Sequence, residues 1–528
     1  MRGRSRKMEK LLERAGCCES GINPRAVYDF VSRCEREGLG IDSFMLIKGG
    51  KVVAEGYHKP YGPLTPHVEF SLSKSIVSLA LGFAVSEGIV SLDDSICKFF
   101  PEYGKEALNK RITLRHLVTM TAGKMIGMAA ERVQKDWIKL FFDTVPIAPP
   151  GKLFLYVNDN FYLLSAALSR AAGRTLTEYL YPRLFEPLGI EKPFWETEQY
   201  GYAAGGWGLY LPIESLAKIM ICCSQKGVYE GRQVIPADYL AEATKYQVPT
   251  VKHGQIDVTK GYGYGFWRTS VPDSYRAYGL YGQLGYVFEN NDTVFVMNSG
   301  IARDMHLSAA IDDMFKTLWD EPEKEYESKL RGLTASLGDK DNVPSRPRNT
   351  ELEEKYDGVT FGTSSSKFAS MLSVTMSTVF NEPTGRIDRM TLHRGEGGRL
   401  GLYWREGEFD NRIELGMDGE YAVSEVRYGQ LVLHACAKAV WVNSYVLRVV
   451  VRMLETPLSR VLEFDFTDEG HVRVRNDSFP NLGDLAVYYV DFSGFPLPKA
   501  LDKLLAKGIV PAILLFGEPT FRLKRVGS

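Results

Sequence analysis

Ser71 and Lys74 stand three residues apart at the start of the sequence FSLSKSIVSLALGFAVSEGI, residues 70–89. On a helix this Ser-x-x-Lys spacing is about one turn, so the lysine ammonium can lie against the serine hydroxyl. The helix N-terminus adds the positive end of a dipole and free backbone N–H groups, which favour a developing oxyanion. A nucleophile, a candidate base and an anion site therefore fall within one short segment.

Two further copies of this spacing occur, at residues 215–218 and 364–367. The copy at 364–367 lies in a serine run with no apolar helix behind it, and the copy at 215–218 begins an ordinary amphipathic pattern. The stretch after Ser71 is instead apolar on nearly every face, which predicts a buried helix closed by Gly88. Because an active-site lysine must be partly desolvated to act as a base, the copy at Ser71 is the favoured nucleophile.

The elements that must position these residues are predicted in outline. Residues 43–57 alternate around two central glycines, which predicts a β-hairpin, and residues 112–119 predict a short helix capped by Thr113. Residues 160–173 predict a longer helix, and residues 261–300 predict antiparallel strands. Glycines within those strands let another backbone or a ligand come close.

Composition bounds the class of protein. The chain has 528 residues, 45% hydrophobic and 24% charged, with a net charge of −1. These values are typical of a globular protein of two or three domains and give no case for a nucleic-acid or membrane partner. No apolar run is long enough to span a membrane, and the N-terminus lacks the apolar core of a secretory signal. The seven scattered cysteines suit neither a disulfide framework nor a zinc site, so we expect reduced thiols, no metal and a cytoplasmic location.

The last third of the chain differs in pattern from the first part. Residues 321–350 are charged and proline-bearing, which predicts a linker. Beyond them alternation dominates, as in residues 445–455 and 461–467, and predicts an antiparallel meander with one short helix near 498–507. No catalytic constellation is found in this part, so residues 351–528 are predicted as a β-rich domain, barrel or sandwich, of unknown role.

The order of several short motifs carries a family resemblance. FSLSKS, GIVSLDD and ITLRHLVTMTAG are followed by Tyr156-Val157-Asn158, by AAGGWGLYLPIESLAKI and by a glycine-bearing strand. In this order they make residues 1–320 resemble the serine β-lactamase and penicillin-binding-protein superfamily, in which Ser-x-x-Lys is a known motif. The closest branch contains class C β-lactamases, related esterases and 6-aminohexanoate-dimer hydrolases. The resemblance implies an α+β fold, with an antiparallel sheet flanked by helices and a helical subdomain.

The resemblance also implies roles for individual residues. Ser71 would be the nucleophile that forms an acyl-enzyme, and Lys74 would lower the barrier to its deprotonation. Tyr156 would act with Lys74 as general base and then as proton donor, provided that the lysine lowers its pKa from about 10. Asn158 would orient Lys74 and the substrate, and an N–H at Gly282–Gln283 would join that of Ser71 in an oxyanion hole.

The third motif of the superfamily is changed in this chain. Lys-Thr-Gly, or His-x-Gly in the esterase-like branch, is replaced by Leu280-Tyr281-Gly282. Without a cation at position 280, a carboxylate-bearing substrate loses its expected partner, which favours a neutral ester or amide. Tyr281 and Tyr286 would extend an apolar surface if their rings face the pocket.

The sequence thus predicts a cytoplasmic serine hydrolase that acts on a small ester, amide or D-amino-acid peptide without a metal or cofactor. The alternative is a catalytically weak or inactive protein that uses the same fold to bind a ligand or partner. A reactive serine would separate the two. The natural substrate, the oligomeric state and the register around Gly282 stay open.

Overall fold

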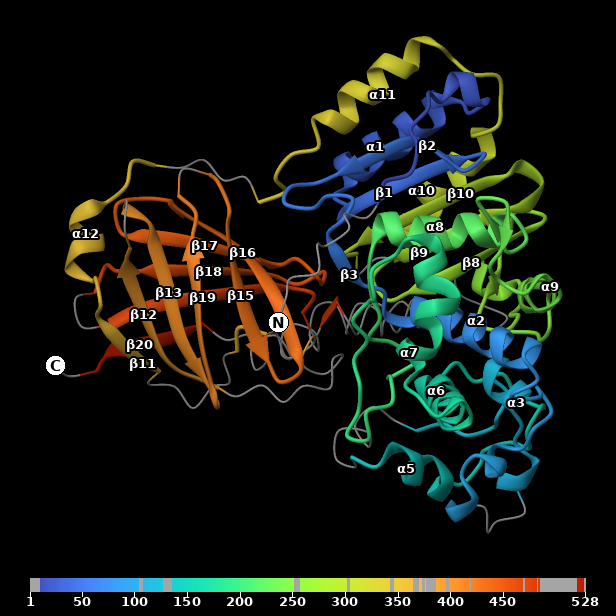
Figure 1. Ribbon diagram of the computed structural model, residues 1–528. Coiled ribbons are helices and arrows are strands. Elements are labelled where there is room, and N and C mark those ends of the chain that lie inside the picture. The colour runs from blue at the N-terminus through green and yellow to red at the C-terminus, as the bar shows by residue number, and fades with distance from the viewer. Residues whose placement is uncertain are drawn as a thin grey trace, which may run out of the picture.

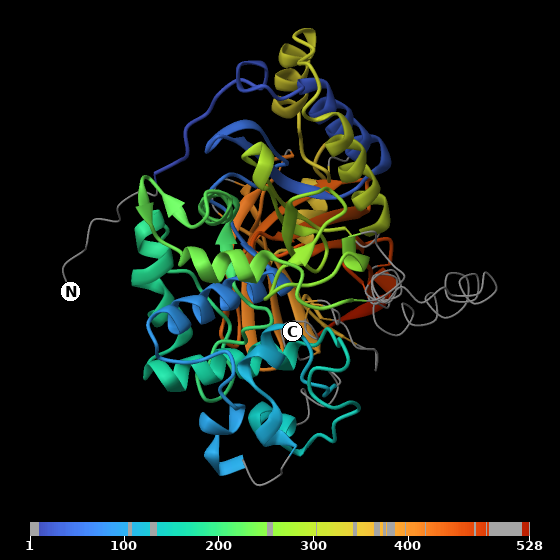
Figure 2. The ribbon, with the colours of Figure 1, turned by 90° about the vertical axis from the view of Figure 1, so that its right-hand side faces the viewer.

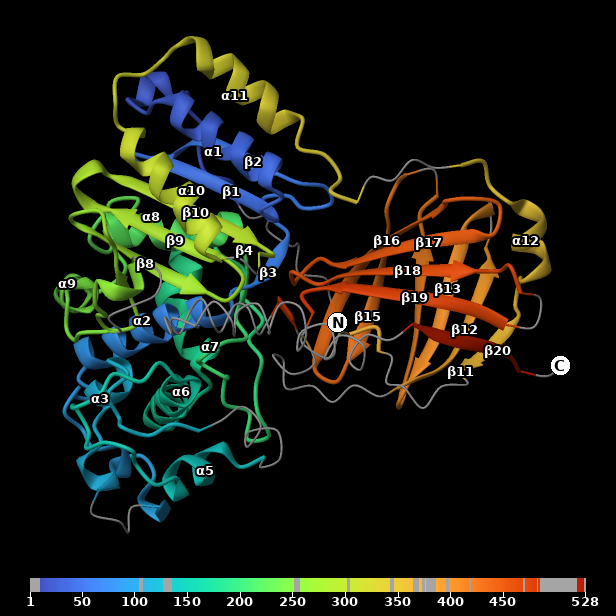
Figure 3. The same ribbon diagram turned by 180° about the vertical axis from the view of Figure 1, so that it is seen from behind.

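The computed structural model consists of two bodies that lie side by side, one built on a six-stranded sheet with helices and one on a ten-stranded sheet (Figure 1). The view from behind shows the same arrangement (Figure 3). The structure describes residues 10–103, 108–126, 135–250, 257–301, 304–341, 346–363, 370–372, 376, 386–395, 398–417, 419–468, 471–481, 483–484 and 520–526. The third Ser-x-x-Lys copy at 364–367 and the helix predicted near 498–507 lie outside these residues.

The first body is organised by an antiparallel sheet with the strand order β2-β1-β10-β9-β8-β7. Its strands are β1 (Ile41–Lys48), β2 (Lys51–Tyr57), β7 (Trp267–Arg268), β8 (Ser274–Gly279), β9 (Gln283–Phe288) and β10 (Thr293–Ser299). This confirms the predicted hairpin at 43–57 and the strands within 261–300. Two short pairs lie beside the sheet, β3 (Pro66–Val68) with β4 (Tyr210–Pro212) and β5 (Val228–Tyr229) with β6 (Arg232–Gln233).

Helices cover both faces of this sheet. On one face α1 (Pro24–Glu37) and α10 (Asp304–Thr317) place Phe30 and Phe315 edge-on to Phe295 of β10, at centroid distances of 5.8 and 5.9 Å. On the other face α8 (Ile213–Ser224) packs closely against Gly285 of β9, which has no side chain to hold the helix away. The helix α11 (Glu325–Ala335) contacts α1, so the connection to the second body begins after this helix rather than at residue 321.

A helical part lies below the sheet in Figure 1. It contains α3 (Leu114–Val118), α5 (Trp137–Asp143), α6 (Asn158–Ala172) and α7 (Leu176–Leu180), while α2 (Ser73–Ser86) and α9 (Ala237–Thr244), which contact each other, lie nearer the sheet. In Figure 2 the blue helix α2 runs between the sheet body and the helical part, and it contacts α6 and α7 as well as β8 and α9. Every α2 residue from Ser73 to Ala84 is buried, and Gly88 follows in the left-handed conformation at φ 69°, so the predicted buried helix is confirmed.

The second body is a nearly closed barrel with the strand order β14-β13-β12-β11-β20-β19-β18-β17-β16-β15. Its strands are β11 (Thr360–Thr363), β12 (Ile387–Arg394), β13 (Leu400–Glu406), β14 (Phe409–Leu415), β15 (Ala422–Tyr428), β16 (Leu431–Trp441), β17 (Val446–Met453), β18 (Ser459–Asp465), β19 (His471–Phe479) and β20 (Phe521–Arg525). The outer strands β14 and β15 lie against each other, and the Glu414 N–H donates to Ser424 Oγ at 2.8 Å. The alternating pattern therefore builds a barrel rather than a sandwich.

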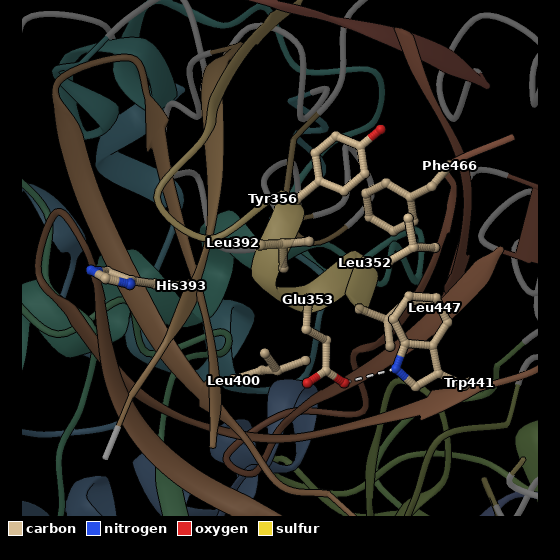
Figure 4. A pocket seen from close by; sticks show the side chains of 9 residues that line it. All are labelled: Leu352, Glu353, Tyr356, Leu392, His393, Leu400, Trp441, Leu447 and Phe466. Atoms are coloured by element: carbon tan, nitrogen blue, oxygen red, sulfur yellow. Dashed lines mark hydrogen bonds between the residues drawn. The ribbon is translucent and has the colours of Figure 1, made fainter. Parts of the chain in front are cut away.

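Side chains fill the interior of this barrel. At its far end, beneath α12 (Thr350–Lys355), a small cavity is lined by Leu352, Glu353, Tyr356, Leu392, His393, Leu400, Trp441, Leu447 and Phe466 (Figure 4). The Trp441 indole N–H donates to Glu353 Oε1 at 2.9 Å. The free volume is about 10 Å³, room for about one water molecule, so this cavity is not a ligand pocket.

Other sequence-based expectations concern cysteines, metals and membranes. All seven cysteines are free thiols. The described residues contain no group of three or more histidine, cysteine or acidic side chains placed to hold a metal ion. Within the same part of the chain, no helix combines the length and the apolar character needed to cross a bilayer.

Candidate active site

The predicted nucleophile lies in a strained turn. Residues Phe70–Leu72 form one turn of 3-10 helix that leads into α2, and Phe70 has a φ of 42°, in the left-handed region. Phe70 and Leu72 are buried, whereas Ser71 between them is partly exposed. Strain of this kind persists only where the surroundings enforce it, and it is concentrated at functional sites. The turn presents the Ser71 hydroxyl at the edge of an otherwise buried segment.

Lys74 connects three segments that are distant in sequence. Its ammonium donates to Ser71 Oγ at 2.8 Å, to Asn158 Oδ1 at 2.8 Å and to the Gly206 carbonyl oxygen at 2.6 Å. These three acceptors can each take one of the three N–H donors of an ammonium. The side chain is almost fully buried, so the cation acts in a site from which most water is excluded. The structure thus brings Ser71, Lys74 and Asn158 together.

Tyr156 completes the cluster. Lys74 Nζ lies 5.0 Å from the centroid of its ring, and its hydroxyl forms hydrogen bonds with the Ser71 side chain and the Trp267 indole. Burial raises the pKa of the Tyr156 phenol, and the hydrogen bonds with Ser71 and Trp267 offset only part of that increase. The expectation that the pKa of Tyr156 is lowered is therefore wrong in direction, because desolvation of the phenolate outweighs its polar contacts.

The direction of this pKa shift makes a prediction about pH. A phenol whose pKa is raised above its ordinary value of about 10 keeps its proton throughout the neutral range. Titration of the wild type and of Tyr156→Phe from pH 6 to about 9.5 should therefore show the same tyrosinate absorbance, while Tyr156→Phe loses about 10²-fold in kcat. A tyrosinate signal near neutral pH that disappears in Tyr156→Phe would contradict the assignment.

Two glycines that the sequence did not single out allow this packing. A Cβ at Gly206 would lie 3.0 Å from the Asn158 carbonyl oxygen, and one at Gly265 would lie 3.0 Å from the Lys74 carbonyl oxygen. Gly265 also accepts a hydrogen bond from Ser75 Oγ at 2.6 Å. The signal was present in the glycine-rich stretches AAGGWG and GYGYGF. The expected close approach of a backbone is confirmed at Gly265.

The altered third motif forms a turn rather than part of a strand. Residues 280–282 connect β8 to β9, and Leu280 is partly buried while Tyr281 and Gln283 are fully buried. The Gln283 amide donates to the Leu280 carbonyl at 3.1 Å and to the Ser299 carbonyl at 2.8 Å. The Gly282 N–H donates to the Gly279 carbonyl at 3.3 Å, so the expected oxyanion donor at Gly282 already has a partner. The side chains of Tyr281 and Gln283 are thus packed inside the protein.

The end of β8 is what approaches the nucleophile. A Cβ at Gly279 would lie 2.2 Å from the Glu69 carbonyl oxygen and 3.2 Å from the Leu72 nitrogen. Leu280 is the next residue and is the member of the motif left partly exposed. Tyr286 lies elsewhere, because its hydroxyl donates to Asp257 Oδ2 at 2.9 Å deep in the sheet body. The expectation that Tyr286 extends the pocket surface is wrong.

The second Ser-x-x-Lys copy corrects another expectation. Residues 215–218 lie in α8, which is buried from Ile213 to Cys223, so the segment at Ser71 does not differ from this copy by heading the only buried helix. Its neighbour Glu214 is fully buried because it pairs with Arg14 at 2.9 Å. What distinguishes Ser71 is the cluster of Lys74 contacts, not burial alone.

Comparisons with known proteins match the first part of the chain. The sequence profile of the β-lactamase family matches residues 31–308, more than half of the chain. The β-lactamase of Escherichia coli K12 is 26% identical over 216 residues, which cover 35% of this chain and 57% of the relative. The β-lactamase of Yersinia enterocolitica is 28% identical over 154 residues, or 28% of this chain and 39% of the relative. The chain therefore spans only about half the length of these curated relatives.

A solved structure supports the fold of the first body. A candidate β-lactamase from Bacteroides dorei DSM 17855 superposes with a TM-score of 0.50 at 14% identity, covering 57% of this chain and 99% of that chain. At this level of identity the likeness concerns the fold alone. The profile match ends at residue 308, so the barrel lies beyond it.

Proposed function

This chain belongs to the β-lactamase family, and from that premise we propose that it is a serine hydrolase that cleaves a small neutral ester or amide through an acyl-enzyme on Ser71. The observation that carries the proposal is the contact of Lys74 Nζ with Ser71 Oγ at 2.8 Å, made beside the Tyr156 hydroxyl. The nucleophilic hydroxyl of Ser71, which is partly exposed, thus lies beside a cation and a phenol that carries a proton.

The order of the proton transfers follows from these contacts. Ser71 Oγ attacks the substrate carbonyl carbon, and its proton passes to the Tyr156 oxygen while Tyr156 gives its own proton to the leaving group. The phenol acts as a relay, so no tyrosinate has to be stored in the resting enzyme. The Lys74 ammonium stabilises the negative charge that develops on Oγ. In deacylation a water loses its proton to Tyr156, which returns a proton to Ser71 as the acyl bond breaks.

Leu280 would decide whether the enzyme prefers neutral or carboxylate-bearing substrates. A leucine offers apolar contact where a substrate carboxylate would need a cation, and no side chain of the 280–282 turn carries positive charge. A missing charge partner costs about 10²-fold or more in discrimination. Neutral acyl esters are therefore the proposed substrates, in preference to cephalosporins or peptides that end in a free carboxylate.

The substrate proposal is tested by comparing kcat/KM for p-nitrophenyl butyrate and nitrocefin. The wild type should prefer the ester, and Leu280→Lys should narrow the difference by improving nitrocefin about 10-fold or more. Leu280→Met is the matched control, because it keeps the size and adds no charge. A wild type that prefers nitrocefin would show that another residue holds the carboxylate.

A further inference from the structure

Aromatic side chains on both sides of the site reach into the second body. Phe70 and Tyr281 belong to the same hydrophobic cluster as the interior of the barrel, together with Val68 and Tyr210. The Tyr281 ring lies edge-on to Phe70 with centroids 5.9 Å apart, and edge-on to Phe479 of β19 with centroids 6.1 Å apart. A barrel residue therefore completes the packing around the nucleophile turn and the 280–282 turn.

Both turns carry a backbone conformation that needs external support. Phe70 has a φ of 42° and Tyr281 a φ of 62°, and L-residues with large side chains rarely adopt this left-handed region. Such residues persist only where the surrounding structure over-determines them. The stack Phe70–Tyr281–Phe479 supplies that support from both bodies. Without the outer ring, Tyr281 can relax toward an ordinary conformation and move the turn.

Backbone contacts beside this stack bring the barrel directly onto the site. The Val68 N–H, three residues before Ser71, donates to the Glu455 carbonyl oxygen at 2.7 Å. At Gly300, directly after β10, a Cβ would lie 2.9 Å from the Phe479 ring and 3.1 Å from Pro457 Cβ. Only a glycine leaves room for so close an approach. The contact is thus built into the sequences of both bodies.

Ion pairs fix the same interface farther from the site. Arg452 of β17 pairs with Asp341 in the connecting segment at 2.5 Å, and Lys340 pairs with Asp42 of β1 at 3.0 Å. Asp42 and Arg452 are buried, so breaking either pair would leave a charge without its partner. The connecting segment is thus paired through charged side chains with both bodies.

We propose that Phe479 is a positioning residue of the active site, through which the barrel holds the Tyr281 and Phe70 turns in the geometry that attack by Ser71 requires. This inference rests on the proposed hydrolase function. It gives the barrel a role in the reaction without placing any barrel side chain on the substrate. Phe479 acts through Tyr281, and the reacting groups stay in the first body.

The test compares two phenylalanines at opposite ends of the barrel. Phe479→Ala should lower kcat for p-nitrophenyl butyrate about 10-fold or more with little change in KM, because small displacements of reacting groups cost one to two orders of magnitude. Phe466→Ala, in the cluster beneath α12 at the far end, removes a ring that is more buried than the half-buried Phe479, but should leave kcat within about 2-fold. Phe479→Leu should recover part of the lost activity.

A double-mutant cycle keeps the inference testable if Phe479→Ala also lowers stability. Glycine adopts the left-handed conformation without strain, so Tyr281→Gly removes both the ring and the need for support. In that background Phe479→Ala should cost less than about 2-fold in kcat, and equal losses in both backgrounds would overturn the inference. An active wild type whose Phe479→Ala variant is unimpaired would overturn this inference alone. A wild type without esterase activity would overturn the proposed function and, with it, this inference.

Discussion

Ser71→Ala is expected to lower kcat for p-nitrophenyl butyrate by about 10⁴-fold or more, because removing a nucleophile abolishes the covalent route and leaves only the background of the site. Steady-state kinetics with freshly purified protein measures the loss. The variant should fold normally, since Ser71 is partly exposed and alanine fits a position that already lies on a helical turn.

The control for this variant is Ser215→Ala. Ser215 opens the second Ser-x-x-Lys copy inside α8, has no exposed surface and differs from Ser71, whose Oγ accepts from the Lys74 ammonium. Its replacement should change kcat by less than about 2-fold, with any cost appearing in stability instead. Comparable losses of kcat in the two variants would contradict the assignment of Ser71 as the nucleophile.

Lys74→Met is expected to lower kcat by about 10³-fold, which corresponds to about 4 kcal/mol of transition-state stabilisation. Methionine keeps most of the length of the side chain but removes the charge and the donors to Ser71, Asn158 and Gly206. Charge-assisted hydrogen bonds are roughly twice as strong as neutral ones, and in a dry site they stabilise a developing oxyanion most. KM should change far less than kcat, because the lysine acts on the reacting oxygen.

Lys218→Met is the matched control, since Lys218 is also buried and also follows a serine by three residues. Both variants should unfold at a lower temperature, because each removes a buried polar group and leaves its partners unpaired. Lys74→Met alone should lose catalysis. A Lys218→Met variant with the same loss of kcat would contradict the assignment of Lys74.

Local signals made much of the fold predictable. The buried helix α2, the hairpin of β1 and β2 and the helix start at Thr113 each follow from a short run of residues, and all three are confirmed. The alternation in β17 and β18 likewise placed Leu447 and Phe464 inside the barrel. In each case the residues that specify the element are also the residues that form it.

Partners distant in sequence could not be predicted. Lys74 meets Asn158 and Gly206 across 84 and 132 residues, and no local pattern records that meeting. The amphipathic pattern at residues 215–218 predicts a helix with one polar face, yet Glu214 of α8 is fully buried and pairs with Arg14 from 200 residues away. The direction of the Tyr156 pKa shift also depended on burial by segments that the sequence could not place.

The covalent adduct on Ser71 is the measurement that tests the central claim most directly. A fluorophosphonate probe should add once to the wild-type chain in intact-mass spectra, and peptide mapping should place the label on Ser71. Ser71→Ala should show no adduct, whereas Ser215→Ala should be labelled like the wild type. An adduct that persists in Ser71→Ala, or that maps to another serine, would contradict the assignment of the nucleophile.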